Sequence, residues 1–253
     1  MIKITSPQEL QTYSLLKRRQ NISIGFVPTM GALHEGHVSL IRAARATCDI
    51  VIASIFINPT QFNSADDFKK YPQTLSSDLE LLAKESVEVA FLPTTDMMYA
   101  DQQRFFIHEN THHLDLCGKT RPGHFDGVLT IVLKLLQLAQ PTHVFMGEKD
   151  YQQLQLVRDM VSAFFIPTEV VASPTVRDTY GLALSSRNTR LSENGLAQAR
   201  FFATTLKQMI PLKTLADTLE KNNIKIDYLE EKNNRRFAAV FIEDVRLIDN
   251  VAL

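Results

Sequence analysis

Short apolar runs alternate with helical patterns through the first 175 residues of the chain. Residues 50–57 are almost wholly apolar and rich in β-branched side chains, as in a strand buried on both faces of a parallel sheet. Similar runs recur at residues 22–27, 87–92, 142–146 and 168–171. Helices are expected between them, at residues 8–19, from residue 33 onward, and at residues 74–85, 128–139 and 151–165. The alternation predicts an α/β fold, a doubly wound parallel sheet with helices on both faces.

The composition changes near residue 176. Residues 177–192 are polar, helices are expected at residues 193–209 and 212–222, and residues 238–248 indicate a final strand pair or one long strand. We therefore expect two domains, residues 1–175 and a smaller α+β domain of residues 176–253, joined near Ser173-Pro174-Thr175.

The charge balance argues against two classes of protein. Lys and Arg total 27 against 28 Asp and Glu, a formal net charge of −1, which disfavours a nucleic-acid-binding protein or a polybasic membrane binder. No stretch approaches the ~18 apolar residues of a membrane span, and residues 1–10 lack the apolar run of a signal peptide. Two cysteines are too few for a disulfide framework. We expect a soluble cytoplasmic protein with reduced thiols, in which Cys48 is a small core residue.

Two histidines open the helix that begins near residue 33. His34 and His37, in the segment His34-Glu35-Gly36-His37, are three residues apart and can share one helix face. A helix N-terminus favours a bound anion, and Gly36 permits close approach of a phosphate. Imidazoles there can donate to a triphosphate during phosphoryl transfer. Ordinary surface or capping histidines are the alternative, and a metal site is less favoured because no Cys or carboxylate cluster lies nearby at ligand spacing.

Two further segments suit phosphate binding. Gly147–Asp150 lies between an expected strand and an expected helix, where glycine permits close approach, lysine can meet a phosphate and aspartate can accept from ribose hydroxyls. The alternative is a turn in which Asp150 caps the helix. Leu184–Asn188 offers two hydroxyls and a guanidinium to a phosphate, unless it is only a solvated linker.

A fourth segment carries neutral amides. Asn58–Phe62 places an amide pair beside an aromatic ring, which suits a hydroxylated organic acid, and Gln153 offers another amide. Gln61 can equally be an exposed loop residue. Asn58–Phe62, Pro28–His37 and Gly147–Gln153 each follow an expected strand. Because the carboxyl ends of parallel strands meet at one sheet edge, where ligands bind, we expect these segments to lie together.

A second cluster contains His112, His113 and Cys117. These side chains can bind zinc. No matching pair of ligands is evident elsewhere, so loop residues are the favoured interpretation.

Taken together, these segments are far more specific than any one of them. Pro28–His37 (PTMGALHEGH) resembles the nucleotide-binding signature of the pantothenate synthetase family, its version of the H-x-G-H motif of class I aminoacyl-tRNA synthetases and related nucleotidyltransferases. Leu184–Asn188 resembles the family's counterpart of the mobile K-M-S-K-S loop of those synthetases. Other matching segments, in the family's order, are Phe56–Phe62, Tyr71-Pro72, Arg121–Phe125 and Gly147–Gln153. The resemblance extends from residue 22 to residue 192.

The resemblance implies a Rossmann-like domain that binds nucleotide and pantoate, a small C-terminal lid and a homodimer. It implies that ATP, pantoate and β-alanine give pantothenate, AMP and pyrophosphate through a pantoyl-adenylate intermediate, with Mg²⁺ required, in coenzyme A biosynthesis. No nucleic-acid or membrane partner is expected, and no residue is assigned as a magnesium ligand. The chain departs from the family's usual pattern at Leu184, where methionine is usual, at Asp178-Thr179-Tyr180, and in its shorter C-terminal domain.

The resemblance also implies residue roles. The implied catalytic residues are His34, His37, Lys149 and Arg187, with His37 as the proton donor. The implied ATP contacts are Met30, Gly31, Ala32, Leu33, His34, Glu35, Gly36, His37, Gly147, Glu148, Lys149, Asp150, Val176, Leu184, Ser185, Ser186 and Arg187. The implied pantoate and β-alanine contacts are Gln61, Gln153 and Asn58, with Arg121 as a supporting cation.

Three other functions fit part of the pattern. A nucleotidyltransferase acting on a phosphate-bearing substrate shares the first and third motifs but does not need the amides of Asn58–Gln61 or Gln153. A non-catalytic nucleotide sensor fits the short C-terminal domain, although both histidines, Lys149 and Arg187 are present. A zinc-binding structural protein is the third.

Overall fold

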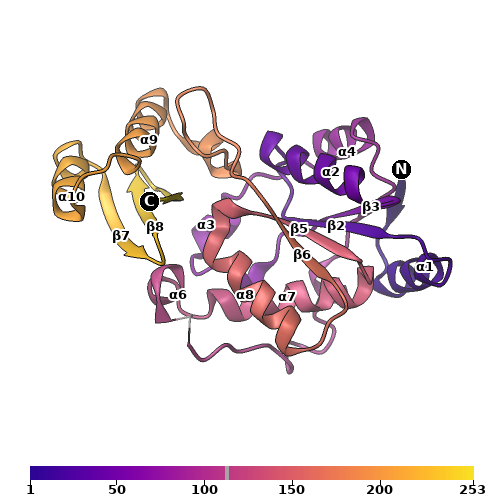
Figure 1. Cartoon of the computed structure of the whole chain (residues 1–253). Coiled ribbons are helices and arrows are strands. Elements are labelled where there is room, and N and C mark those ends of the chain that lie inside the picture. The colour runs from indigo at the N-terminus through magenta and orange to yellow at the C-terminus, as the bar shows by residue number, and fades with distance from the viewer. Residues whose placement is uncertain (112–113) are drawn as a thin grey trace.

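The computed structural model describes residues 1–111 and 114–253 and contains two sheets (Figure 1). The larger sheet has six parallel strands in the order β1-β4-β3-β2-β5-β6, so the predicted doubly wound sheet is confirmed. Its strands are β1 (Ile2–Ile4), β2 (Ile24–Thr29), β3 (Ile50–Ile55), β4 (Val89–Phe91), β5 (His143–Gly147) and β6 (Glu169–Ser173). The edge strand β1 was not predicted, because three residues are too few to display an apolar alternation.

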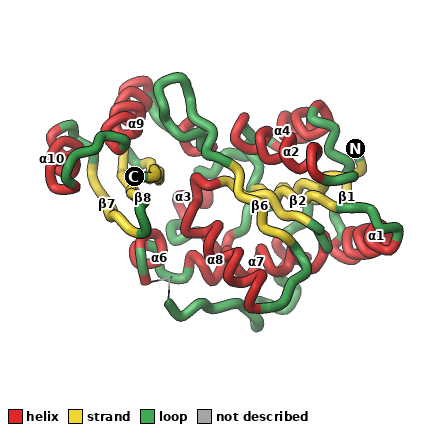
Figure 2. The backbone as a smooth tube through the Cα atoms, viewed as in Figure 1, coloured by secondary structure: helices red, strands yellow, loops and turns green. Residues whose placement is uncertain are grey.

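Helices cover both faces of this sheet (Figure 2). The main helices are α1 (Pro7–Arg19), α2 (Glu35–Thr47), α4 (Leu75–Lys84), α7 (His124–Ala139) and α8 (Tyr151–Ala163). Leu10, Leu129 and Val157 pack α1, α7 and α8 into one buried cluster, whereas Ile41 and Leu82 pack α2 and α4 into another. Burial of these apolar stripes, at about 25 cal/mol per Å², is the main favourable term that holds the layers together.

The central strand β2 separates from β5 near the carboxyl end of the sheet. It pairs with β3 from Ile24 to Thr29, but with β5 only through Gly25 and Phe26. Pro28 has no N–H to donate, yet it continues β2 instead of ending the strand as predicted, because β2 has already parted from β5. The strand order reverses between β2 and β5, which makes this gap the topological switch point where ligands bind.

The smaller sheet forms the C-terminal domain. It consists of the antiparallel strands β7 (Lys225–Lys232), β8 (Arg235–Ile242) and β9 (Val245–Ala252), packed against α9 (Glu193–Leu206) and α10 (Leu212–Lys221) around a separate core. The prediction of a strand pair or one long strand at residues 238–248 was therefore incomplete. A turn at residues 243–244 divides that run, and the mostly polar sequence of β7 concealed an edge strand.

Short helices lie between the longer elements, and the two parts of the chain are in contact. The short helices are α3 (Ala65–Lys69), α5 (Thr95–Met98), α6 (Leu116–Thr120), η1 (Pro59–Gln61), η3 (Glu148–Asp150) and η4 (Ser186–Arg190). Tyr228 and Ile248 of the small sheet pack against the larger core. The Asn250 side-chain amide donates to the carbonyl oxygens of Glu148, at 3.0 Å, and Lys149, at 2.9 Å. The turn after β5 is therefore held by both sheets.

The environments of the cysteines differ from those predicted. Cys48 is half-buried at the end of α2, with Sγ 3.4 Å from His143 Nδ1, and so lies at the edge of the core. Cys117 is buried in α6, with Sγ 3.1 Å from the Tyr228 hydroxyl, and is not a loop residue. The predicted partners of Cys117 in the second cluster, His112 and His113, lie outside the described residues. No helix among the described residues is long and apolar enough to cross a bilayer.

Candidate functional site

A cavity of about 250 Å³ lies at the gap between β2 and β5. Its walls come from the start of α2, the segment after β3, the turn after β5 and the loop before η4. The predicted site residues that line it are Met30, His34, Gly36, His37, Asn58, Gln61, Gly147, Lys149, Asp150, Gln153, Val176, Leu184, Ser185, Ser186 and Arg187. The fold thus brings together the four segments that the sequence singled out.

The two histidines at the start of α2 form a reciprocal cap. His34 Nδ1 accepts from the Gly36 N–H at 3.1 Å, and His37 Nδ1 accepts from the His34 N–H at 3.3 Å. Because each Nδ1 is an acceptor, the proton of each neutral ring is assigned to Nε2. A β-carbon on Gly36 would lie 2.8 Å from the His34 ring, so glycine is required there to seat the ring. Capping and ligand binding are therefore compatible, because capping uses Nδ1 and leaves the Nε2–H donors.

Burial keeps both histidines neutral. Burial first, then the positive charge of Lys149, lowers the pKa of His34 to about 4, and the nearby Asp150 only partly offsets this. Burial, together with His34 and Lys149, lowers the pKa of His37 to about 3. The charge of Lys149 thus reaches both rings. At neutral pH the two imidazoles offer N–H donors without adding positive charge of their own.

The loop between β2 and α2 is held by a buried aspartate that the sequence analysis missed. Asp78, on α4, is 3% exposed and accepts from the N–H groups of Ala32, at 2.9 Å, and Leu33, at 2.8 Å. Thr74 Oγ1 also donates to it at 3.2 Å. The only signal in the sequence was an acidic residue beside the apolar stripe of α4. Its contacts fix the backbone that leads into His34.

Several predicted nucleotide contacts support the loops and do not line the cavity. Ala32 and Leu33 are held by Asp78 as described, and the Ala32 carbonyl also accepts from Ser186 Oγ at 2.9 Å. Gly31 has φ 78°, and Glu35 pairs with Arg42 at 2.6 Å. The Glu148 carbonyl is bound by Asn250. The residues Gly31, Ala32, Leu33, Glu35 and Glu148 are not among those that line the cavity.

A network of hydrogen bonds around the Asn58 amide shapes the wall after β3. Asn58 is 1% exposed, accepts from the hydroxyls of Thr60 at 3.0 Å and Tyr99 at 2.7 Å, and donates to Gln61 Oε1 at 3.0 Å and the Gly127 carbonyl at 3.2 Å. The Asn58 side chain is thus fully engaged inside the protein. Gln61 lines the cavity, so the alternative of an exposed loop residue is wrong.

Arg121 and His124 clamp the backbone of Gln61. Arg121 Nη2 donates to the Gln61 carbonyl at 3.0 Å, and His124 Nδ1 lies 2.8 Å from the same oxygen. Arg121 Nη1 lies 2.9 Å from His124 Nε2, so Nε2 is the acceptor and His124 is neutral. Burial, then the charge of Arg121, lowers the pKa of His124 to about 3. Burial and the nearby Arg246 and Arg187 also lower the pKa of Arg121.

These pKa shifts predict a loss of stability in mild acid. His34, His37 and His124 are neutral when folded, but regain an ordinary pKa near 6.5 on unfolding, so the unfolded chain binds more protons below that pH. The free energy of unfolding should fall as pH decreases from 6.5 toward 4, by up to about 1.4 kcal/mol per pH unit for each histidine. Urea unfolding followed by circular dichroism at pH 7, 6 and 5 measures this slope. A His124→Gln variant with the same slope as the wild type would contradict the contribution of His124.

The turn after β5 leaves its ligating groups accessible. Asp150 occupies the N-cap position of α8 but makes no side-chain capping hydrogen bond, so capping does not account for this residue. Lys149 Nζ lies 3.7 Å from Asp150, and the Lys149 side chain is 20% exposed. A β-carbon on Gly147 would meet no atom within 4 Å, which leaves open space above the backbone. Both functional side chains are therefore available to a ligand.

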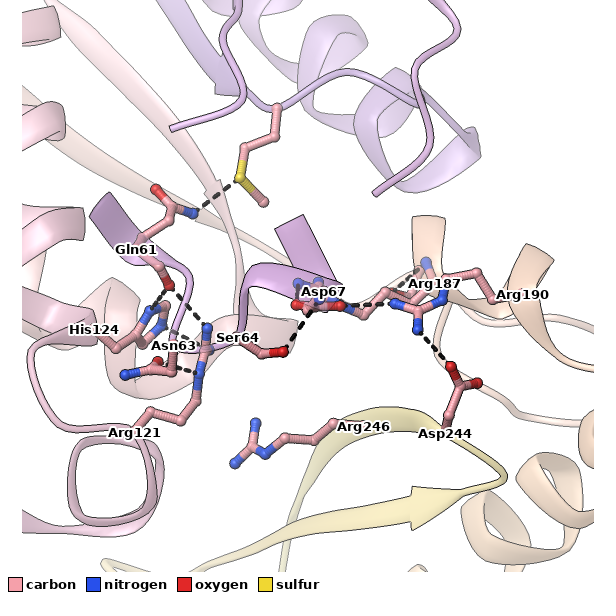
Figure 3. Close-up of polar contacts among 12 residues, drawn as sticks. Gln61, Asn63, Ser64, Asp67, Arg121, His124, Arg187, Arg190, Asp244 and Arg246 are labelled. Carbon is pink, nitrogen blue, oxygen red and sulfur yellow. Dashed lines mark hydrogen bonds and ion pairs between the residues drawn. The ribbon is translucent and has the colours of Figure 1, made fainter. Parts of the chain in front are cut away.

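The short helix η4 places an arginine at the junction of two cavities. Ser185 caps η4 through the Arg187 N–H, and Arg187 pairs with Asp67 of α3 at 2.8 Å (Figure 3). The Arg187 guanidinium also lies 5.3 Å from the centre of the Tyr71 ring. A second cavity of about 420 Å³ between the two domains shares Arg187, Lys149 and Arg121 with the first. Asp67 was not identified from the sequence, because nothing local connects it to Arg187.

Comparison with known proteins gives a consistent assignment. The sequence model of the family described as pantoate-beta-alanine ligase matches residues 3–252. The chain is 47% identical over 233 residues to the pantothenate synthetase of Legionella pneumophila (strain Lens), covering 92% of each chain. It is 44% identical over 250 residues to that of Bdellovibrio bacteriovorus, covering 99% of this chain and 98% of the relative.

Comparison with solved structures leads to the same family as the sequence comparison. The chain matches the pantoate-beta-alanine ligase of Francisella tularensis, complexed with beta-gamma ATP and beta-alanine, with a TM-score of 0.96 and 42% identity, over 100% of this chain and 97% of the other. It matches the pantothenate synthetase of Thermus thermophilus with a TM-score of 0.89 and 34% identity, over 100% and 99%. Sequence, fold and cavity point the same way: this chain belongs to the pantoate–β-alanine ligase family.

Proposed function

We propose that this protein is an ATP-dependent ligase that condenses pantoate with β-alanine to form pantothenate, AMP and pyrophosphate. The observation that carries the proposal is the single cavity at the sheet switch point, where His34, His37, Lys149 and Arg187 lie with the amides of Gln61 and others. Cationic and N–H donors there suit a triphosphate, and the neutral amides suit a hydroxylated acid. Membership of the family supports the same reaction.

The proposed chemistry needs no protein nucleophile. The pantoate carboxylate attacks the α-phosphorus of ATP, the bond to the bridging oxygen breaks, and pyrophosphate leaves with that electron pair. The amine of β-alanine then attacks the acyl carbon of the pantoyl adenylate, loses a proton and expels AMP. Two anions that repel each other in water must be aligned, and alignment can contribute about 7–11 kcal/mol. The protein's part is to hold the reactants and neutralise charge on the leaving group.

The donors fit the phosphate end of ATP. His34 and His37 offer Nε2–H groups to phosphate oxygens, and His37 is the group assigned to supply a proton to the leaving phosphate. Because its pKa is about 3 before ATP binds, its first contribution is a hydrogen bond from the neutral ring. Lys149 and Arg187 stabilise the transferring and departing phosphates, and Ser185 adds a hydroxyl donor, whereas the Ser186 hydroxyl donates to the Ala32 carbonyl and holds the loop.

The remaining lining residues divide between adenosine and pantoate. We assign Met30, Gly147, Asp150, Val176 and Leu184 to the adenosine site, where Asp150 can accept from the ribose hydroxyls.

Gln61 and Gln153 are assigned to pantoate, with Gln61 also bordering the β-alanine site. The dimethyl carbon of pantoate then faces the apolar side chains of Val128 and Ile131, which line the same cavity. Since the Asn58 amide is fully engaged, we assign it to orienting Gln61 and not to direct contact.

Magnesium is proposed to enter with the nucleotide. Among the described residues there is no group of three or more His, Cys, Asp or Glu side chains able to hold a metal ion. Mg²⁺ commonly keeps several waters and binds substrate phosphates with few protein ligands. Phosphate oxygens and water would therefore supply most of its ligands, and the ion would neutralise charge on the departing pyrophosphate.

We also propose a domain boundary and an oligomeric state for this protein. A boundary at residues 175/176 separates the nucleotide- and pantoate-binding domain from a C-terminal lid, supported by the end of β6 at Ser173 and the separate core that starts at Leu182. A cytoplasmic homodimer is proposed. The adjacent Phe105 and Phe106 side chains are 70% and 62% exposed, as expected for a surface that a second copy covers. Light scattering of the purified protein tests the dimer.

One assay tests the function. Purified protein is mixed with ATP, Mg²⁺, pantoate and β-alanine, and AMP and pantothenate are measured by mass spectrometry. Pyrophosphate release that depends on pantoate alone, in a stoichiometric burst, is expected for an adenylate intermediate. A nucleotide sensor would bind ATP without turnover, and a nucleotidyltransferase would ignore pantoate; either result contradicts the proposal.

Gln61→Ala is expected to weaken the use of pantoate. The substitution removes an amide that lines the cavity, and loss of a substrate hydrogen bond should raise the pantoate KM on the order of 10-fold. The KM for ATP should change little, because Gln61 is assigned to pantoate and not to the phosphates. Steady-state kinetics with each substrate varied provides the measurement. An unchanged pantoate KM and rate would contradict the assignment.

A further inference from the structure

The Asp67 carboxylate forms ion pairs with two arginines of η4, Arg187 and Arg190. Its Oδ2 accepts from Arg187 Nη2 at 2.8 Å, while Oδ1 accepts from Arg187 Nε at 3.4 Å and from Arg190 Nη1 at 2.7 Å (Figure 3). Burial tends to raise the pKa of Asp67, but hydrogen bonds and charges from Arg187 and Arg190 outweigh it and lower the pKa overall. The carboxylate is therefore ionised at neutral pH, and it binds one edge of the Arg187 guanidinium.

The other edge of Arg187 is left free. Within residues 1–111 and 114–253, no hydrogen-bond partner is found for Arg187 Nη1. The guanidinium also lies over the Tyr71 ring at 5.3 Å and the Phe62 ring at 6.0 Å, and Tyr71 is 6% exposed. A long arginine side chain loses much rotamer freedom when it is held in one position. Asp67 and the two rings impose that loss before any ligand arrives, while Nη1 remains available as a donor to an anion.

Asp67 itself sits on a supported element. Ser64 Oγ caps α3 by accepting from the Asp67 N–H at 3.4 Å. Arg190 also reaches Asp244 at 3.2 Å, and Lys70, next to α3, pairs with Asp244 at 2.7 Å. This chain of charges connects α3 to the turn between β8 and β9. Asp67 is thus fixed from both sides of the domain junction.

We infer that Asp67 is a positioning residue that holds Arg187 in place for the leaving phosphate. The inference rests on the proposed function. A carboxylate beside Arg187 offsets part of the positive charge that attracts ATP, so Asp67 does not serve to strengthen ground-state binding. Its contribution is geometric: it keeps one donor edge of Arg187 aimed at the charge that develops as pyrophosphate departs.

The experiment is a double-mutant cycle with a matched control. Asp67→Asn removes the charge at nearly constant volume, and Asp67→Glu retains it. The control, Asp66→Asn, makes the same charge change at the neighbouring position of α3, where no side-chain contact is found among the described residues. Wild type, the three single variants, Arg187→Ala and Asp67→Asn/Arg187→Ala are assayed for kcat and the ATP KM, and their folding is checked by thermal unfolding.

A positioning role predicts a specific pattern. Asp67→Asn lowers kcat on the order of 10²-fold with little change in the ATP KM, Asp67→Glu recovers much of kcat, and Asp66→Asn behaves as wild type. In the Arg187→Ala background, Asp67→Asn has almost no further effect, because it acts through Arg187.

Three results overturn the inference: additive losses in the cycle, an unchanged kcat with a lower ATP KM in Asp67→Asn, or loss of folding in Asp67→Asn with no recovery in Asp67→Glu. A wild type that makes no pantothenate overturns the proposed function itself, and the inference with it. The two failures are therefore distinguishable.

Discussion

Lys149→Ala is expected to lower the rate of adenylate formation by a factor on the order of 10²–10³ and to leave the fold intact. The only ion-pair partner of the Lys149 ammonium among the described residues is Asp150, at 3.7 Å, so most of its charge is available to a phosphate. Its charge also acts on both histidines. Pantoate-dependent pyrophosphate release measures the effect, because that step precedes the arrival of β-alanine.

His37→Ala should act in the same direction, because it removes an Nε2–H donor from the same end of the cavity. Lys221→Ala is the matched control, because this lysine is exposed on α10, away from both cavities. Near-normal turnover in purified Lys149→Ala and His37→Ala would refute the assigned roles. An equal loss in Lys221→Ala would show that the effect is not specific to the phosphate end.

Gly127→Ala is expected to damage stability and pantoate use together. A β-carbon at Gly127 would lie 2.5 Å from the Thr60 carbonyl oxygen and 2.6 Å from its carbon, contacts that only a shift of the backbone can relieve. Overpacking of this kind typically costs about 1–3 kcal/mol. The shift would move η1, which carries Gln61, so the pantoate KM should rise on the order of 10-fold as well.

The control for this change lies on the same helix. Gln137 is exposed on α7, and Gln137→Ala should leave both the thermal midpoint and the kinetics near wild type. Calorimetry and pantoate titration are performed on both variants. A Gly127→Ala enzyme with wild-type stability would mean that α7 and η1 separate easily, and would contradict the close packing argued here.

Most of the fold could be read from the sequence because the large sheet is buried on both faces. β3 is mostly apolar and rich in β-branched residues, and α2 carries its apolar residues at helical spacing, so β3 and the start of α2 were predicted within two residues of their observed bounds. β7 could not be predicted, because an edge strand with the sequence KIDYLEEK has no apolar face that repeats clearly. The sequence predicted that β2 ends at residue 27, but the strand continues through Pro28 to Thr29. The prediction was wrong because the divergence of β2 from β5 is a tertiary feature.

The functional site, like the fold, could be predicted from the sequence only in part. His34, His37, Lys149 and Arg187 lie in motifs whose residue types already indicate phosphate chemistry, and the structure brings all four to one cavity. Asp67, Asp78 and Gly127 carry no such local signal. Their importance depends on contacts with Arg187, Ala32 and Thr60, which are distant along the chain, so only the folded arrangement reveals them.

The two hydrogen bonds from Asn250 have a consequence for the position of Lys149. They connect β9 to the carbonyl groups that flank Lys149, so the small sheet cannot move away without breaking them or displacing the lysine backbone. The backbone position of Lys149 therefore depends on the small sheet as well as on β5.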